Sequence, residues 1–191
     1  RSFHSILPGS AFEYYSGMGF NRSVNTDPDG SYYAMRSVNS TKYLVIQSYK
    51  LEYSDTKTLL ENLKNFEKID EQDGFTIFKN KAYIPIGYSN SYYISDDEYE
   101  KIAKSNRDNM LARAVVLTDE QIEKYSDILP ELEPDRYSDF NYYTFEKDAQ
   151  ELAKTAVDTF TPTANGFKAT SSFTEDRFVT FTVPWESGWS A

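Results

Sequence analysis

The chain of 191 residues contains no cysteine and a single histidine, His4. Without cysteine, disulfides, thiolate zinc sites, iron–sulfur clusters and cysteine nucleophiles are impossible. With one histidine, a metal site built from several imidazoles is impossible as well. A site built from carboxylates is the metal chemistry that this composition leaves open.

Positive charge is scarce, because 20 lysine and arginine residues face 30 aspartate and glutamate residues, for a formal net charge of −10. This balance excludes a broad electrostatic surface for nucleic acid or anionic lipid. Long apolar runs are missing too. The longest stretch without charge, residues 82–95, has 14 residues and contains Pro85 and Gly87. A bilayer-spanning helix needs about 20 mostly apolar residues, so we expect no span within this sequence.

The chain begins with Arg1 and shows no charged segment followed by an apolar one, the pattern of a secretory signal. We expect it to be part of a longer protein. A hydrophobic fraction of 39% with 16% aromatic residues is typical of a folded protein. A chain of this size buries roughly 70% of the surface that its unfolded form exposes, enough for one core or two small ones.

Periodicity in the first two-thirds of the chain predicts both helices and strands. Leucines and a phenylalanine at helical spacing predict a helix over residues 55–66, and Ser95 and Thr118 each cap the start of another helix. Runs of β-branched and aromatic residues predict strands at 42–47, 75–80, 82–87 and 115–117. Pro85 would place the third of these at an edge. Together these elements predict an α+β fold with a mixed β-sheet flanked by helices.

A charged stretch with two prolines, residues 130–139, is predicted to be a linker. It divides the chain into an α+β domain, residues 1–134, and a β-rich unit, residues 135–191. Residues 141–160 fit either a helix or a segment that begins as a strand. The strands predicted for this unit are residues 167–170 and 178–183. We expect part of a β-sandwich-like unit, truncated at its C-terminal end.

Three patterns bear on chemistry. Residues 27–30, Asp-Pro-Asp-Gly, resemble the start of a calcium loop, but the proline and the missing later glutamate favour a plain turn. Acidic clusters at 96–98 and 119–120 could serve as acid and base on a sugar, yet their positions at helix starts predict capping. No Gly-x-Ser-x-Gly elbow or phosphate-binding glycine loop occurs. We predict no catalytic residue, no metal site and no cofactor.

Tyrosine is abundant, with 16 residues, and several lie in segments rich in glycine, serine and asparagine. Aromatic rings offer the CH-rich face of a sugar a flat apolar partner, while phenol hydroxyls form hydrogen bonds. Half-burial of the same rings in a β-rich core is the alternative explanation, and the composition favours it. The candidate carbohydrate-binding residues are Tyr14, Tyr15, Tyr32, Tyr33, Tyr92 and Tyr93.

Four segments, in this order, resemble the large extracytoplasmic region of the YfhO family of bacterial polytopic membrane proteins. They are residues 2–19, 35–45, 78–88 and 183–191. The third contains Asn80, Pro85 and Gly87, and the fourth reads Val-Pro-Trp-Glu-Ser-Gly-Trp-Ser-Ala, with Trp185 where the family usually has tyrosine. The four segments span nearly the whole chain.

The resemblance implies a domain on the extracytoplasmic side of the cell membrane, attached to a glycosyltransferase-like membrane part. Such proteins are linked to glycosylating cell-envelope polymers of the teichoic-acid type from a lipid-linked sugar donor. The catalytic carboxylate then lies in loops of the membrane part, so this chain would position or recognise the acceptor without catalysing. Its partners would be the membrane-embedded remainder and the glycopolymer, and not nucleic acid. Two alternatives stay open: a structural or protein-interaction module, and a free-standing carbohydrate-active enzyme.

Overall fold

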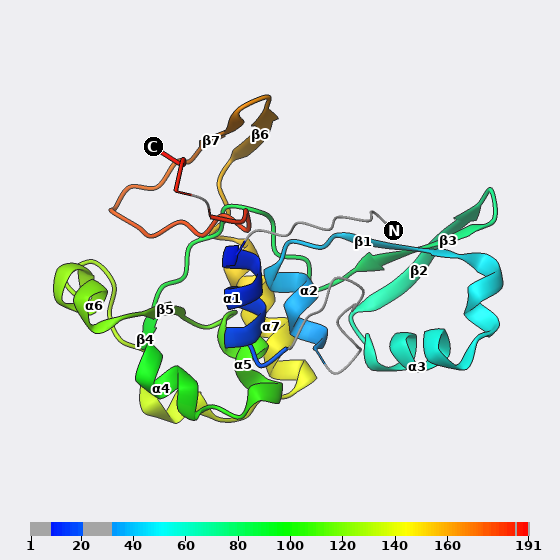
Figure 1. The fold of residues 1–191 in the computed structure, drawn as a ribbon, viewed down its shortest axis with the longest axis horizontal. Helices are drawn as coiled ribbons and strands as arrows, with labels where there is room; N and C mark the ends of the chain where they lie inside the picture. Colours follow the sequence, from blue (N-terminus) through cyan, green and yellow to red (C-terminus); the bar gives the residue numbers. More distant parts are fainter. Residues whose placement is uncertain (1–8, 21–31, 186, 191) are drawn as a thin grey trace.

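The structure, a computed structural model, describes residues 9–20, 32–185 and 187–190. His4 and the turn predicted at residues 27–30 lie outside these residues. The described residues form an α+β fold, which confirms the predicted class (Figure 1). None of their helices is long and apolar enough to cross a bilayer.

Two helices open the described chain, helices and strands are interspersed through its middle, and a β-hairpin follows the last helix. The α-helices are α1 (Gly9–Gly17), α2 (Tyr33–Val38), α3 (Ser54–Asn62), α4 (Asp96–Lys101), α5 (Arg107–Met110), α6 (Asp119–Tyr125) and α7 (Tyr142–Ala153). The strands are β1 (Tyr43–Gln47), β2 (Phe66–Gln72), β3 (Phe75–Asn80), β4 (Tyr93–Ser95), β5 (Val115–Leu117), β6 (Thr159–Thr163) and β7 (Gly166–Thr170). Short 3-10 helices are η1 (Ser48–Glu52), η2 (Lys104–Asn106) and η3 (Pro134–Tyr137).

The strands form three small sheets. β1, β3 and β2 make an antiparallel sheet in the order β1-β3-β2, β4 pairs with β5 in parallel, and β6 pairs with β7 as a hairpin. The strands predicted at 42–47, 75–80 and 115–117 are confirmed, but 115–117 lies in a different sheet from the other two. β2 was not predicted, because it is an edge strand with only its first residue partly buried, and such a strand has no apolar alternation.

The strand predicted at residues 82–87 is wrong. This segment is irregular, although Ala82 and Ile84 are fully buried. Pro85 has no N–H to donate to a ladder, and Gly87 has a φ of +79°, which turns the chain out of a strand. The apolar residues therefore pack into the core without pairing.

The central core joins helix α2, the irregular segment after β3 and helix α7. It contains Val38 from α2, Ile84 and Tyr88, and Phe145 and Leu152 from α7, all buried. The ambiguous segment 141–160 is therefore a helix in its first part, capped by Asn141, and a strand from residue 159. Residues on both sides of position 134 share this core, and the division into two domains stays a prediction.

Helix capping follows the sequence closely. Ser95 Oγ accepts the N–H of Glu98 at 3.3 Å, at the start of α4. Thr118 Oγ1 accepts the N–H of Gln121 at 3.4 Å, and the Gln121 side chain accepts the Thr118 N–H at 3.0 Å. Both caps confirm the predicted helix starts and account for the acidic clusters that follow them, because carboxylates in a first turn stabilise the helix dipole.

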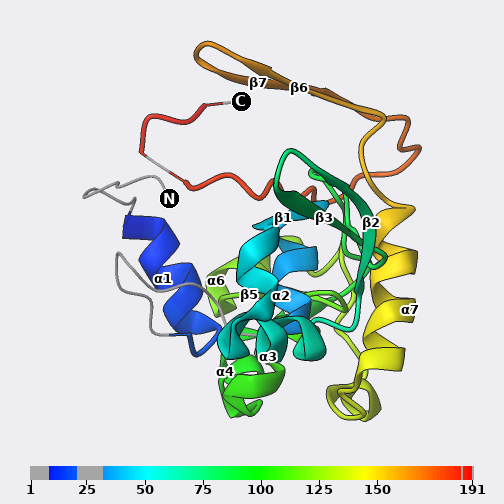
Figure 2. The same cartoon turned by 90° about the vertical axis from the view of Figure 1, so that its right-hand side faces the viewer.

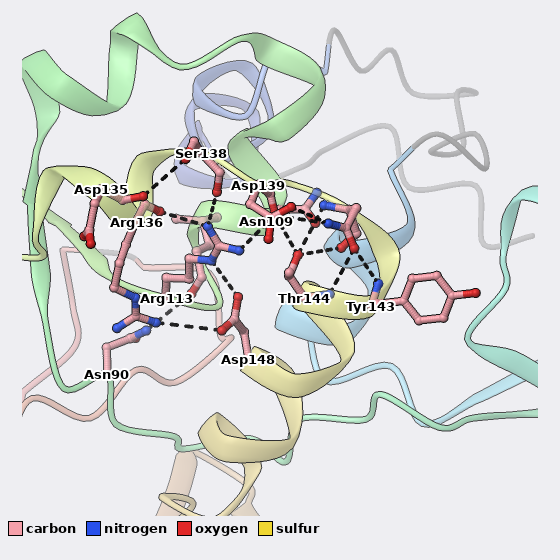
Figure 3. Close-up of polar contacts among 12 residues, drawn as sticks. Asn90, Asn109, Arg113, Asp135, Arg136, Ser138, Asp139, Tyr143, Thr144 and Asp148 are labelled. Atoms are coloured by element: carbon pink, nitrogen blue, oxygen red, sulfur yellow. Dashed lines mark hydrogen bonds and ion pairs between the residues drawn. The ribbon is translucent and has the colours of Figure 1, made fainter.

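Residues 130–139, the predicted linker, are bound by a buried arginine. Arg113 donates hydrogen bonds to the C=O groups of Arg136 (2.8 Å), Ser138 (2.7 Å) and Asp139 (3.3 Å). Its Nε also donates to Asp148 Oδ2 in α7 at 2.6 Å (Figure 3). The guanidinium thus fixes the chain that enters α7, although the segment has the composition of a linker.

The C-terminal part consists of the β6–β7 hairpin, which projects from the body in both views, and an extended segment (Figures 1 and 2). The strand predicted at 178–183 is wrong apart from a single bridge, Tyr88 to Thr180. This segment packs its side chains instead of forming a ladder. Phe181 lies against Phe167, with ring centroids 4.6 Å apart, and a Cβ added to Gly87 would lie 2.9 Å from Phe181.

Candidate functional site

A cavity of about 1100 Å³ lies under helix α1. Its wall comes from α1, α2, α4, α5, β5 and residues 180–185, elements that lie far apart in the sequence. In Figure 1, α1 crosses the middle of the molecule in front of α5 and α7. The cavity therefore exists only in the folded chain, and α1 forms its roof.

Helix α1 is held over the cavity by polar contacts. None of its residues is buried. Ser10 Oγ donates to the C=O of Trp185 at 2.8 Å, and Tyr14 Oη donates to Asn39 Oδ1 at 2.9 Å. Apolar anchoring comes just after the helix, where Met18 is buried against Met35 of α2. The C-terminal end of α1 is thus fixed by apolar packing, and Ser10 and Tyr14 each hold the rest of the helix by a hydrogen bond.

Four tyrosines line the cavity. Tyr14 and Tyr15 from the roof stand edge to face, with ring centroids 5.6 Å apart. Tyr88 and Tyr99 also line the cavity, and burial raises the pKa of both phenols above the ordinary value of 10. Tyr14, in contrast, is 39% exposed. At neutral pH these phenols are uncharged donors and acceptors, suited to hydrogen bonding and not to nucleophilic attack.

The charged groups of the cavity are mostly acidic. Glu13, Asp96 and Glu100 line it together with two arginines, Arg36 and Arg107. Arg107 uses all three guanidinium nitrogens inside the protein, donating to the C=O groups of residues 102 (3.1 Å), 17 (2.8 Å) and 100 (2.6 Å). This arginine ties the end of α1 to α4 with three of its five N–H groups.

A buried carboxylate next to the cavity holds helix α2. Asp108 is fully buried and accepts the N–H of Met35 at 3.1 Å and Nδ2 of Asn109 at 3.0 Å. Helix α2 begins at Tyr33 without a local side-chain cap, so Asp108 from α5 caps it across the core. Burial raises the pKa of Asp108 to about 6, and the hydrogen bonds that it accepts oppose this.

The structure brings some of the predicted tyrosines together and separates the rest. Tyr14 and Tyr15 line the cavity, and Tyr32 packs beside Phe20 near the same roof. The other three predicted tyrosines pack against or within the core. Tyr33 is partly buried and its Oη donates to Asn109 Oδ1 at 2.7 Å. Tyr92 is partly buried with the Arg136 guanidinium over its ring, and Tyr93 is buried.

Sequence reasoning missed Tyr99 as a cavity residue and did not select Tyr88 as a site residue. Tyr88 lies in the segment 78–88 that carries part of the family resemblance, and Tyr99 follows the cap of α4. Within the described residues, no group of three or more acidic or histidine side chains could hold a metal ion. The buried charges, Asp108 and the pair of Arg113 with Asp148, are fully engaged in holding helices.

The chain was compared with family models, with curated proteins and with solved structures. No family model matches it. No curated protein and no solved structure matches it either. The resemblance to the YfhO family therefore stays a hypothesis, and the geometry of the cavity carries the functional argument.

Proposed function

We propose that the chain is a non-catalytic binding domain on the extracytoplasmic side of a YfhO-like membrane protein, and that the cavity under α1 receives sugar units of a cell-envelope glycopolymer. The observation that carries this proposal is the cavity of about 1100 Å³ lined by four tyrosines. The membrane-embedded remainder would perform glycosyl transfer and would be the main partner of this domain.

The lining supports a sugar ligand in particular. Small-molecule sites commonly occupy about 300–1000 Å³, so this cavity has room for more than one pyranose ring. Tyrosine rings stack against the apolar face of a sugar. The phenol oxygens can accept from its hydroxyl groups while the O–H groups of Tyr14, Tyr88 and Tyr99 donate within the protein. Asn39 and Asn90 add amide groups that can both donate and accept.

The charges of the cavity favour the sugar part of a glycopolymer over its phosphates. Arg107 directs three of its five N–H groups to carbonyl groups of the protein, and Glu13, Asp96 and Glu100 contribute negative charge. The chain as a whole carries −10, which repels a polyanion at long range. An uncharged glycosyl residue meets none of this repulsion, so we place a sugar, not a phosphodiester, in the cavity.

Titration with saccharides, followed by NMR of the aromatic protons, tests the proposal. We expect the ring signals of Tyr14 and Tyr15 to shift with neutral oligosaccharides, while those of Tyr143, 76% exposed on α7 and far from the cavity lining, stay in place. Tyr14→Ala removes one stacking surface and should weaken binding by about tenfold, whereas Tyr143→Ala should not change it. Unmoved cavity tyrosines across neutral glycans and teichoic-acid fragments would refute the proposal.

A structural or protein-interaction module is the second candidate. It is favoured by the packing of Tyr33, Tyr92 and Tyr93, half of the tyrosines selected from sequence, against or within the core clusters. The same titration separates the two, because a structural module leaves every tyrosine signal unmoved. Turnover of a glycan by the isolated chain would instead support the third alternative, a free-standing carbohydrate-active enzyme.

A further inference from the structure

The three-stranded sheet has two edges, β1 and β2, which differ in composition. β2, Phe-Glu-Lys-Ile-Asp-Glu-Gln, is charged along its length and has a register shift between Lys68 and Asp70. Charges and bulges are the features by which natural proteins keep an edge strand from pairing. β1, Tyr-Leu-Val-Ile-Gln, has no charge, no proline and no register shift. Of these two edges, β1 is the one open to another strand.

The register of the sheet identifies the backbone groups of β1 that face β3. The N–H of Asn80 donates to the C=O of Lys42 at 2.9 Å, and the N–H of Ser48 donates to the C=O of Gly74 at 2.7 Å. Even-numbered positions at both ends of β1 therefore bond toward β3. In an antiparallel ladder, residues that bond to the partner alternate with residues that do not. The even-numbered residues inside β1 bond to β3 in the same way.

It follows that Tyr43, Val45 and Gln47 direct their N–H and C=O groups away from β3. Within the part of the chain that the structure describes, none of the hydrogen bonds outside helices and ladders reaches these groups. We call them the β1 edge. The C=O of Gln47, the N-cap of η1, accepts the first bond of that helix and keeps its second lone pair for another donor. Another strand beside β1 would form hydrogen bonds with the N–H and C=O groups of this edge, as β3 does with those of Leu44 and Ile46.

The side chains of the β1 edge are also uncovered. Tyr43 is 48% exposed and Val45 is 57% exposed, although both are apolar or aromatic. Tyr49 Oη donates to Gln47 Oε1 at 3.2 Å, which places a second exposed tyrosine beside the end of the edge. The three-stranded sheet and α3 lie at one end of the molecule, apart from α4, α6 and the hairpin (Figure 1).

The charge distribution permits two such sheets to meet. Residues 42–81, which contain the sheet and α3, hold seven lysines and seven acidic residues. The whole net charge of −10 therefore lies outside this part of the chain. Contact through the sheet brings neutral surfaces together and keeps the acidic regions apart, so the repulsion between two copies is weakened by distance and screening.

We propose that the chain forms a twofold-symmetric homodimer in which the β1 edge pairs with that of a second copy, antiparallel, about an axis at Val45. Val45 then lies opposite Val45 of the partner subunit, and Tyr43 opposite Gln47 of the partner subunit. Tyr43 and Gln47 lie at equal distances on either side of Val45, so the twofold axis forms three hydrogen-bonded residue pairs. Each such pair exchanges two backbone hydrogen bonds, which makes about six in all. The two sheets become one continuous sheet of six strands.

Other partners fit this edge less well. Lipid offers no donors or acceptors for open backbone groups, and open sheet edges do not occur in hydrocarbon. A charged partner strand finds no opposite charge on β1. A second β1 supplies β-branched and aromatic cross-strand pairs without placing like charges opposite each other.

Sedimentation of the full 191-residue chain over a range of concentrations tests the proposal. We expect a reversible species of twice the 22.1 kDa chain mass. Val45→Lys places two ammonium groups opposite each other at the axis and should weaken dimerisation by at least about tenfold. Ile69→Lys, the same kind of change at an exposed position on the β2 edge, is the matched control and should dimerise as the wild type does.

Amide hydrogen exchange gives a readout that does not depend on how each variant folds. Raising the wild-type concentration should slow exchange at Tyr43, Val45 and Gln47, whereas Leu44 and Ile46 should be protected at every concentration. A wild type that stays monomeric up to millimolar concentration overturns the proposal. So does a dimer that Ile69→Lys weakens as much as Val45→Lys, or one in which the odd-numbered amides exchange unchanged.

Discussion

Replacing Asp148 by asparagine removes the carboxylate that neutralises a buried arginine. The Arg113 side chain is 6% exposed and that of Asp148 is 18% exposed, and the two are joined at 2.6 Å. A second guanidinium, that of Arg136, lies 3.8 Å from the other carboxylate oxygen (Figure 3). The substitution keeps the shape of the side chain and one acceptor oxygen, so that the change in stability reports mainly on the lost charge.

The size of the effect follows from burial. Breaking a buried ion pair on one side costs about 3–5 kcal/mol, because the remaining charge is left without a counter-charge. Arg113 keeps its three carbonyl acceptors, and Asp148 is not fully buried, so we expect the low end, about 3 kcal/mol. Since folded domains are stable by about 5–15 kcal/mol, this is a large fraction of the whole.

Equilibrium unfolding in urea measures the change. With a slope near 2 kcal/mol/M, the midpoint should fall by about 1.5 M and the slope should not change. Glu151→Gln is the matched control, because Glu151 lies on the same helix and pairs with Lys154 at 2.5 Å in an exposed position. An exposed pair is worth about 0–1 kcal/mol, so the control should unfold nearly as the wild type does.

Salt gives a further test of the same reasoning. One molar sodium chloride shortens the screening length to about 3 Å and should abolish any effect of Glu151→Gln, but it should leave the effect of Asp148→Asn largely intact. If the two variants lose the same stability, or if Asp148→Asn loses less than about 1 kcal/mol, then Arg113 does not depend on its partner and the structural role assigned to this pair is wrong.

Three further predictions concern stability. The pKa of Asp108 is raised to about 6 in the folded state, against about 3.9 in the unfolded chain, so the folded state gains stability as the pH falls through 6. The gain between pH 7 and pH 4 should be about 2–3 kcal/mol. Urea titrations at the two pH values should show that Asp108→Asn abolishes this gain. Gly87→Ala should lower the free energy of unfolding by about 2–4 kcal/mol, whereas Gly74→Ala, with a similar φ in open space, should cost about 1 kcal/mol by calorimetry. Asn80→Ala leaves buried polar groups around Asn65 unpaired and should cost about 2–3 kcal/mol, with faster amide exchange there.

Each of these three predictions has a result that would contradict it. A stability difference between wild type and Asp108→Asn that is the same at both pH values would show that the carboxyl titrates normally. Equal losses for the two glycine variants would mean that backbone conformation, and not the close approach of Val157, sets the cost at Gly87. An Asn80→Ala variant as stable as the wild type would mean that solvent replaces the lost hydrogen bonds.

Local signals in the sequence predicted the elements that depend on neighbouring residues. The strands over β1, β3 and β5 follow from apolar and β-branched runs, and the caps at Ser95 and Thr118 bond as their spacing predicts. These interactions lie within a few residues of each other, so the chain order alone specifies them. The α+β class follows from the same elements.

Predictions failed where the same residue types serve long-range packing. Residues 82–87 and 178–183 are apolar and strand-like, but they bury their side chains against α7 and the hairpin instead of pairing. β2 pairs although it is mostly charged and exposed, because its partner β3 supplies the buried face of the sheet. The apolar pattern of a sequence indicates which side chains are buried, but a buried segment does not always pair its backbone in a β-sheet.

The sequence by itself determined the absence of cysteine chemistry, the acidic charge, the α+β class and the abundance of tyrosine. Only the tertiary structure decided which tyrosines meet, because Tyr14, Tyr88 and Tyr99 come from three separate segments that fold around one cavity. It also decided that Arg113 binds a segment with the composition of a linker. Contacts between residues far apart in the chain depend on how helices and strands pack, and no local pattern of residues encodes that packing.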